Sequence, residues 1–103
     1  METRAAKNQA VRGELLYYLT TVYPYGAGLS LIQRELDFLG YSRAAEEIDD
    51  HVAYLEERGF VVVEEFPGRD PRRRVRLVRL TDLGVDYYNG RLPVDPGVYV
   101  ERT

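Results

Sequence analysis

The sequence has no cysteine and no tryptophan among its 103 residues, and it has only one histidine. Without thiols the chain can form neither a disulfide scaffold nor a thiolate zinc site, and a single histidine cannot build a metal cluster. No apolar run approaches the ~20 residues that a membrane-spanning helix needs, and residues 1–14 lack the apolar stretch of a secretory signal. These absences predict a cytoplasmic protein without a membrane segment, a bound metal or a cofactor.

Patterns typical of catalysis are also missing. The chain has no Gly-rich phosphate loop and no cysteine nucleophile. Acidic doublets such as Glu46 and Glu47 are neighbours in sequence, so their side chains diverge on a helix and do not form an acid–base pair. We interpret the single histidine, His51, as a paired surface imidazole on the flank of a helix. The sequence therefore predicts a protein that is not an enzyme.

Charge is unevenly distributed along the chain, although the net charge is only −3. Residues 42–58 contain two arginines and six carboxylates, whereas residues 69–79 contain six arginines and a single carboxylate, Asp70. A net charge of −3 gives no global attraction for nucleic acid, but a local arginine cluster can still bind phosphate. The functional question is therefore whether the basic segment binds nucleic acid although an acidic segment lies next to it in the sequence.

Hydrophobic spacing and turn residues predict three helices before the arginine cluster. The first runs from residue 3 or 8 to residue 22, with apolar side chains at helical intervals. Ser30 opens the second helix as the N-cap of an S-L-I-Q capping box. Ser42 caps the third helix, and Gly59 ends it.

A β-hairpin and a short helix follow. Residues 60–66 and 73–80 are expected to pair as antiparallel strands, with Val62 and Leu80 facing the core. Thr81 then caps a last helix that Gly90 closes. Residues 1–90 would form one domain, and residues 91–103, which contain two prolines, would form an extended C-terminal arm that is ordered only if something holds it.

This order of elements resembles the winged helix-turn-helix domain, an α+β fold of three helices, a hairpin wing and a short last helix. The stretch "LEERGFVVVEE" resembles the end of the third helix and the first wing strand, and it places Leu55 and Phe60 in the core. The stretch "RLTDLG" resembles the junction between the second wing strand and the last helix. The resemblance covers roughly residues 8–90 and implies a fold rather than a function.

The chain is also similar to small winged-helix proteins encoded in Mu-like prophages. The early "PYG" turn and the ending "LTDLGVDYYNGRLPVDPGV" carry this resemblance. It implies a phage origin and little chemistry, because those proteins have no settled function.

The third helix of a helix-turn-helix domain usually enters the major groove with its outward face. Here that face carries Glu46, Glu47, Asp50 and Glu57, called the acidic face below. Carboxylates can accept hydrogen bonds from cytosine, but phosphates would repel four of them, so we favour a solvated face. Candidate DNA contacts are instead basic or at a helix start: Ser42, Arg43, Arg69, Arg72, Arg73, Arg74 and Arg76. The alternative is that these arginines are neutralised by Glu64, Glu65 and the acidic third helix.

Tyrosine is abundant, with nine residues against three phenylalanines. Tyrosine is enriched in protein interfaces, and in winged-helix proteins the first and last helices often form the dimer contact. The candidate residues of a homodimer interface are Tyr17, Tyr18, Tyr87, Tyr88 and Tyr99. The alternative interpretation is core packing, with the hydroxyl groups reaching the surface.

Two functional hypotheses follow. The first is a homodimeric regulator of transcription, of phage type, that contacts double-stranded DNA mainly through a basic wing. The second is a protein-interaction module that offers its acidic face to a basic partner and does not bind DNA. The winged-helix resemblance and the excess of arginine place DNA binding first.

Overall fold

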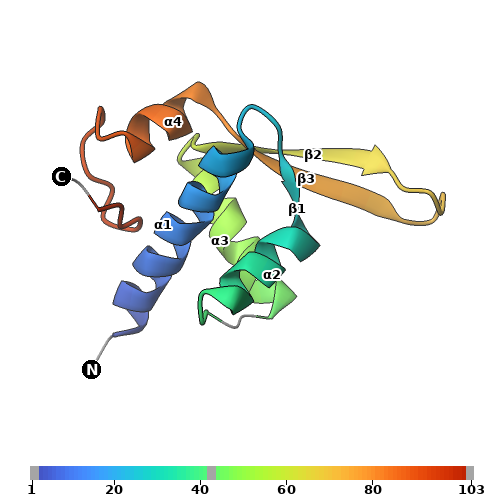
Figure 1. Cartoon of the computed structure of the whole chain (residues 1–103), viewed down its shortest axis with the longest axis horizontal. Helices are drawn as coiled ribbons and strands as arrows, with labels where there is room; N and C mark the ends of the chain where they lie inside the picture. The colour runs from blue at the N-terminus through green and yellow to red at the C-terminus, as the bar shows by residue number, and fades with distance from the viewer. Residues whose placement is uncertain (1–2, 42–43, 102–103) are drawn as a thin grey trace.

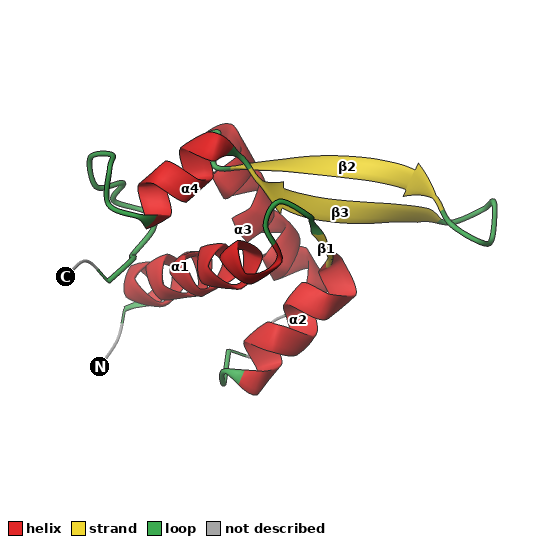
Figure 2. Ribbon diagram, turned by 45° about the horizontal axis from the view of Figure 1, so that its top comes forward, coloured by secondary structure: helices red, strands yellow, loops and turns green. Residues whose placement is uncertain are grey.

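The computed structural model describes residues 3–41 and 44–101 of the chain. Within these residues, four helices and a three-stranded antiparallel sheet form an α+β fold, as predicted (Figure 1). The sheet order is β1-β3-β2, and the β2–β3 hairpin extends well beyond the helices (Figure 2). In chain order the elements are α1 (Arg4–Val22), β1 (Ala27–Gly28), α2 (Leu29–Phe38), α3 (Ala45–Glu57), β2 (Val61–Pro67), β3 (Arg74–Leu80) and α4 (Asp82–Tyr88).

The first helix, α1, forms the centre of the core. Thr3 is its N-cap, and the Thr3 hydroxyl accepts a hydrogen bond from the backbone N–H of Ala6 at 3.1 Å. Its apolar stripe is fully buried and contributes Val11, Leu15, Leu16 and Leu19. The helix contacts α2, α3, α4 and β3, so α1 holds the other elements together.

The second and third helices begin at different residues from those predicted. Gly28 is the N-cap of α2, without a side-chain hydrogen bond, so the capping box at Ser30 is wrong. The reason is that Gly28 also pairs with Leu77 in the sheet, and the chain passes directly from strand to helix. Ala44 is the N-cap of α3, so the cap predicted at Ser42 is also wrong. Residue 42 itself, like residue 43, lies outside the described residues.

The hairpin is present as predicted, but the phase of its first strand differs. Val61 pairs with Leu80, and both are buried. Val62 pairs with Arg79 on the other face, so the expectation that Val62 faces the core is wrong. Alternate residues of a strand point to opposite faces, and a shift of one residue exchanges them. The strand begins at Val61 because Gly59, at φ 82°, ends α3 and sets the direction of the chain.

The last helix, α4, begins and ends as predicted. The Thr81 hydroxyl accepts a hydrogen bond from the backbone N–H of Gly84 at 3.0 Å. The same hydroxyl donates to the backbone carbonyl of Gly59 at 2.6 Å. Thr81 therefore caps α4 and also ties it to the end of α3. Gly90 follows the helix with a φ of 79°.

The C-terminal arm folds back onto its own chain. The backbone N–H of Tyr99 donates to the carbonyl of Gln9 on α1 at 3.1 Å. The Tyr87 hydroxyl donates to the carbonyl of Val98 at 2.8 Å and accepts from the N–H of Asp95 at 3.0 Å. Val98 is 1% exposed and belongs to the core. The described part of the arm, residues 91–101, is therefore held by α1 and α4 of the same molecule.

Gly13 makes this close packing possible. It lies in the middle of α1, where glycine normally weakens a helix. A Cβ atom at this position would overlap the backbone carbonyl oxygen of Tyr99. The glycine therefore allows the arm to lie directly on the helix.

We predict that Gly13→Ala lowers the free energy of unfolding by about 1–2 kcal/mol, because the methyl group would displace the arm. Helix propensity alone predicts the opposite, a gain of about 1 kcal/mol. Urea denaturation of the two proteins measures the sign. Ala53→Gly, at an exposed position of α3, is the control for the propensity term in this chain. A more stable Gly13→Ala protein would contradict the packing of the arm on α1.

Candidate functional site

The turn of the hairpin, residues 68–73, lies farthest from the helices and is called the tip (Figure 1). The backbone N–H of Gly68 donates to the carbonyl of Arg73 at 2.9 Å. The Asp70 carboxylate accepts a hydrogen bond from the backbone N–H of Arg72 at 3.0 Å. The single carboxylate of the arginine-rich segment thus helps to shape the turn.

The arginines of β3 are paired with carboxylates. The distances are 3.6 Å from Arg74 Nε to Glu65 Oε2, 3.1 Å from Arg76 Nη1 to Asp49 Oδ1, and 2.8 Å from Arg79 Nη2 to Glu64 Oε1. These side chains are all about a third or more exposed, and exposed ion pairs contribute only about 0–1 kcal/mol each. The charges of these three arginines are therefore neutralised by carboxylates of the same chain.

The arginines of the tip are in a different situation. Arg69, Arg72 and Arg73 are all exposed. Arg72 lies 3.5 Å from Asp70 and its side chain is 91% exposed. Among the residues that the structure describes, Arg69 and Arg73 make no ion pair. Positive charge that could meet a ligand is therefore concentrated at the tip.

The acidic face of α3 is exposed as predicted, at Glu46, Glu47, Asp50 and Glu57. Over residues 3–41 and 44–101, the ion pair between the hairpin and α3 joins Arg76 to Asp49, which is not part of this face. The hairpin arginines therefore do not cover the acidic face. The candidate DNA contacts Ser42 and Arg43 lie outside the described residues.

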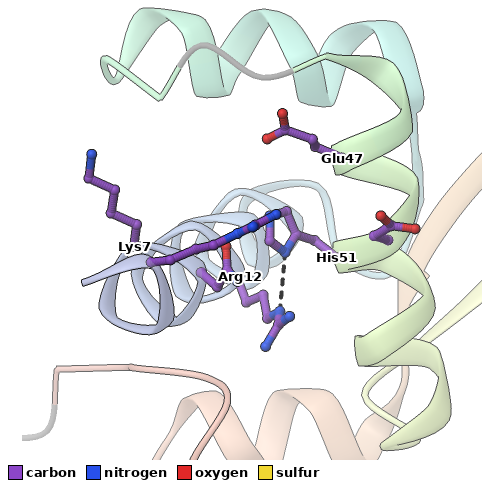
Figure 3. Close-up of a pocket in the computed structure, with 7 residues that line it drawn as sticks. Lys7, Arg12, Glu47 and His51 are labelled. Atoms are coloured by element: carbon purple, nitrogen blue, oxygen red, sulfur yellow. Dashed lines mark hydrogen bonds between the residues drawn. The ribbon is translucent and has the colours of Figure 1, made fainter. Parts of the chain in front are cut away.

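A cleft of about 530 Å³ separates the N-terminal half of α1 from α3 (Figure 3). Basic side chains from α1 face carboxylates from α3 across it. Its lining consists of Arg4, Lys7, Asn8, Arg12, Glu47, Asp50 and His51. Sequence reasoning did not predict the cleft, because it depends on how α1 and α3 cross.

Arg12 closes one side of this cleft and connects three segments of the chain. Its Nε donates to Nδ1 of His51 at 3.1 Å (Figure 3). Its Nη1 donates to the carbonyl of Gly97 at 3.1 Å. The guanidinium carbon lies 3.9 Å from the centroid of the Tyr54 ring. His51 is only 4% exposed, so its interpretation as a surface imidazole is wrong, although it is paired. The arm and α1 cover it.

Tyr54 lies on α3 and is half-buried beneath the arm. The Tyr54 hydroxyl donates to Asp95 Oδ1 at 2.6 Å. Arg58 lies 5.0 Å from the centroid of the Tyr54 ring and pairs with the Asp95 carboxylate at 3.2 Å. The Tyr54 ring thus lies between two guanidinium groups, with Asp95 balancing part of their charge.

A second groove, of about 350 Å³, lies between α1, the end of α4 and the arm. We call it the tyrosine groove. Its lining consists of Ala10, Gly13, Glu14, Tyr17, Tyr41, Tyr88, Tyr99, Val100 and Glu101. The rings of Tyr17 and Tyr88 have centroids 6.2 Å apart and are tilted by 33°. Tyr41 was not singled out from the sequence, because a lone tyrosine after a helix carries no pattern.

The five tyrosines of the candidate dimer interface separate into two groups. Tyr17, Tyr88 and Tyr99 come together at the tyrosine groove. Tyr18 is half-buried against the core, and Tyr87 is 1% exposed. The Tyr87 ring stacks on Phe60 with centroids 4.4 Å apart. Tyr87 therefore packs in the core of its own chain, although its hydroxyl is buried against Val98 rather than at the surface as the core-packing alternative supposed.

No significant match to this chain was found among protein-family models, curated proteins or solved structures. No helix in the described part of the chain is long and apolar enough to span a membrane. The same residues contain no group of three or more His, Cys, Asp or Glu side chains placed to hold a metal ion. The function is therefore argued from the charges and surfaces described above.

We predict that Arg12→Met lowers the free energy of unfolding by about 2 kcal/mol, because it removes the donor to the buried His51 ring and to the partly buried Gly97 carbonyl. Hydrogen exchange at the Tyr99 amide should also become faster, since the arm loses one of its contacts with α1. Lys7→Met, at an exposed position of the same helix, is the matched control and should change stability by less than about 0.5 kcal/mol. Equal effects of the two substitutions would show that Arg12 does not hold the arm.

Proposed function

We propose that the chain is a winged-helix protein that binds double-stranded DNA through the tip of the β2–β3 hairpin and acts as a regulator of transcription. The single observation that carries this proposal is the cluster of exposed arginines at the tip, two of which lack an ion pair in the described part of the chain. The order of helices and strands is consistent with the winged-helix resemblance of the sequence. The part of the proposal that makes the regulator one of phage type rests on the resemblance of the sequence alone.

Arginine at the end of a projecting hairpin suits contact with the DNA backbone. The planar guanidinium donates paired hydrogen bonds to phosphate oxygens. A narrow turn can also approach the minor groove, where arginine is a common contact. Contacts to phosphate fix position but do not read sequence. We therefore propose that the tip supplies affinity with little sequence preference.

The acidic face argues against the usual insertion of α3 into the major groove. Glu46, Asp50 and Glu57 are exposed and make no ion pair with any residue that the structure describes. Phosphates on both sides of a groove would repel them. In this proposal the hairpin approaches DNA and the acidic face stays outside the groove.

The arginines of the tip are expected to dominate the salt dependence of DNA binding. We predict that combined Arg69→Ala, Arg72→Ala and Arg73→Ala substitutions reduce the slope of log affinity against log salt by about 2–3, because each neutralised phosphate contributes about 0.9. Fluorescence anisotropy with a mixed-sequence duplex across a salt series measures the slope. Arg4→Ala, Lys7→Ala and Arg91→Ala together remove the same charge away from the tip and should leave most of the slope intact. Equal slopes for the two triple variants would contradict binding through the tip.

Removing negative charge from α3 should have the opposite effect. We predict that Glu46→Gln with Glu47→Gln strengthens binding to the same duplex several-fold at low salt, because repulsion of the phosphates is relieved. Asp86→Asn, on α4, is a control for a single lost charge elsewhere. Loss of binding in the glutamine variant would mean that the carboxylates read bases, which would contradict the proposed orientation.

The exposed acidic face supports a second candidate function, a protein-interaction module that binds a basic partner. Its carboxylates are accessible and the hairpin arginines do not cover them. Failure to bind duplex DNA at ~100 μM protein and low salt, where non-specific binders are normally engaged, would favour this function. A homodimer through Tyr17, Tyr88 and Tyr99 also remains a proposal, although the arm needs no second copy to hold it.

A further inference from the structure

The tyrosine groove combines aromatic rings with negative charge. Four tyrosines line it, namely Tyr17, Tyr41, Tyr88 and Tyr99. Two carboxylates, Glu14 and Glu101, line it as well, and within residues 3–41 and 44–101 no lysine, arginine or histidine does. Its volume of about 350 Å³ falls at the lower end of the range for small-ligand pockets. The groove therefore has the size and charge to receive a small cationic group.

The polar side-chain groups of the groove have no partners among residues 3–41 and 44–101. The hydroxyls of the four tyrosines make no hydrogen bond there, and neither carboxylate makes an ion pair. Burial raises the pKa of Tyr88, and the neighbouring Tyr17 and Glu14 raise it further. The negative charge of the groove comes from its two carboxylates, Glu14 and Glu101, and favours a nearby cation.

The same molecule already uses this combination of groups to hold arginine. The guanidinium groups of Arg12 and Arg58 lie 3.9 Å and 5.0 Å from the centroid of the Tyr54 ring. The carboxylate of Asp95 accepts from both Arg58 and the Tyr54 hydroxyl. A tyrosine ring with an adjacent carboxylate therefore stabilises a guanidinium group in this fold, through cation–π attraction and charge-assisted hydrogen bonds. The tyrosine groove offers more rings and a second carboxylate, and no guanidinium of the described residues lines it.

We propose that the tyrosine groove binds a guanidinium group of the size of an arginine side chain. The planar cation would lie against the rings of Tyr17, Tyr88 or Tyr99, and its N–H groups would donate to Glu14 and Glu101. The source is either a small alkylguanidinium or an arginine of another polypeptide. This site is independent of the proposed DNA contact, because the arm and the hairpin tip lie at opposite ends of the molecule (Figure 1).

The test is an NMR titration of the full chain with N-acetyl-arginine methylamide and with its neutral citrulline analogue. The arginine probe should shift the amide resonances of Gly13, Tyr99 and Val100 in a saturable manner. The citrulline probe should bind about tenfold more weakly, because it keeps the shape but lacks the charge. A pentapeptide with one central arginine distinguishes the sources: much tighter binding indicates a polypeptide ligand, and equal binding indicates that the side chain alone is recognised.

Variants separate recognition from general charge attraction. Tyr99→Leu and Glu14→Gln should each weaken binding of the arginine probe about three- to tenfold, whereas Tyr99→Phe should retain it because the ring persists. The Tyr99 side chain is 61% exposed, so these changes leave the core intact. Glu57→Gln, on the acidic face, should have no effect. Arg102→Gln, a change next to the lining residue Glu101 in sequence, should also leave the affinity unchanged.

Three results would overturn the proposal. The first is equal binding of the arginine and citrulline probes, or shifts spread over the acidic face of α3. The second is a several-fold gain in affinity for Arg102→Gln, which would mean that the groove is filled by its own chain. The third is a dimer in sedimentation that Tyr99→Leu dissociates, together with no response to the arginine probe, which would assign the groove to a second copy.

Discussion

The packing of the C-terminal arm on α1 determines which surfaces the molecule presents. Arg12 is central to this packing. Its guanidinium donates hydrogen bonds to His51 on α3 and to Gly97 on the arm, and the face of the guanidinium lies on the Tyr54 ring. Arginine offers several donors in one plane together with a face that stacks, which lysine cannot do. Gly13 allows the backbone of the arm to come close enough for these contacts. Both the buried state of His51 and the walls of the tyrosine groove follow from this arrangement.

The register of the hairpin decides which arginines are neutralised. Glu65 lies directly opposite Arg76 and diagonal to Arg74, and Glu64 lies diagonal to Arg79. Cross-strand and diagonal neighbours are within reach of long side chains, so the carboxylates of β2 pair with the arginines of β3. Beyond Arg74 there is no strand opposite, and Asp70 is the one carboxylate in the turn. Positive charge is therefore left at the tip by the geometry of strand pairing.

The features that were predicted from the sequence depend on local signals. The apolar spacing of α1, the Thr81 cap and the glycines after α3 and α4 act within a few residues, and each was confirmed. Two of the errors arose where distant segments meet. The start of α2 depends on the pairing of Gly28 with β3, and the burial of His51 depends on Arg12, 39 residues away.

The candidate sites show the same division between local and distant effects. The sequence identifies the arginine cluster and the acidic face, because both are runs of like charge in one segment. It does not separate the paired arginines of β3 from those of the tip, since that separation requires the strand register. The sequence also does not predict that Tyr41 and Glu101 line the same groove. The two residues are far apart in the chain and come together only because the arm folds back.

The overall charge of −3 is a poor guide to what such a molecule binds. Salt at physiological concentration screens exposed charges over about 8 Å, so a ligand responds mainly to the groups nearest to it. At the tip those groups are arginines on a narrow turn, whereas at the tyrosine groove they are carboxylates and aromatic rings. The ion pair between Arg76 and Asp49 places the acidic helix beside the hairpin, behind the tip. A polyanion would therefore meet favourable charge at the tip and increasing repulsion toward the base, which limits contact to the tip.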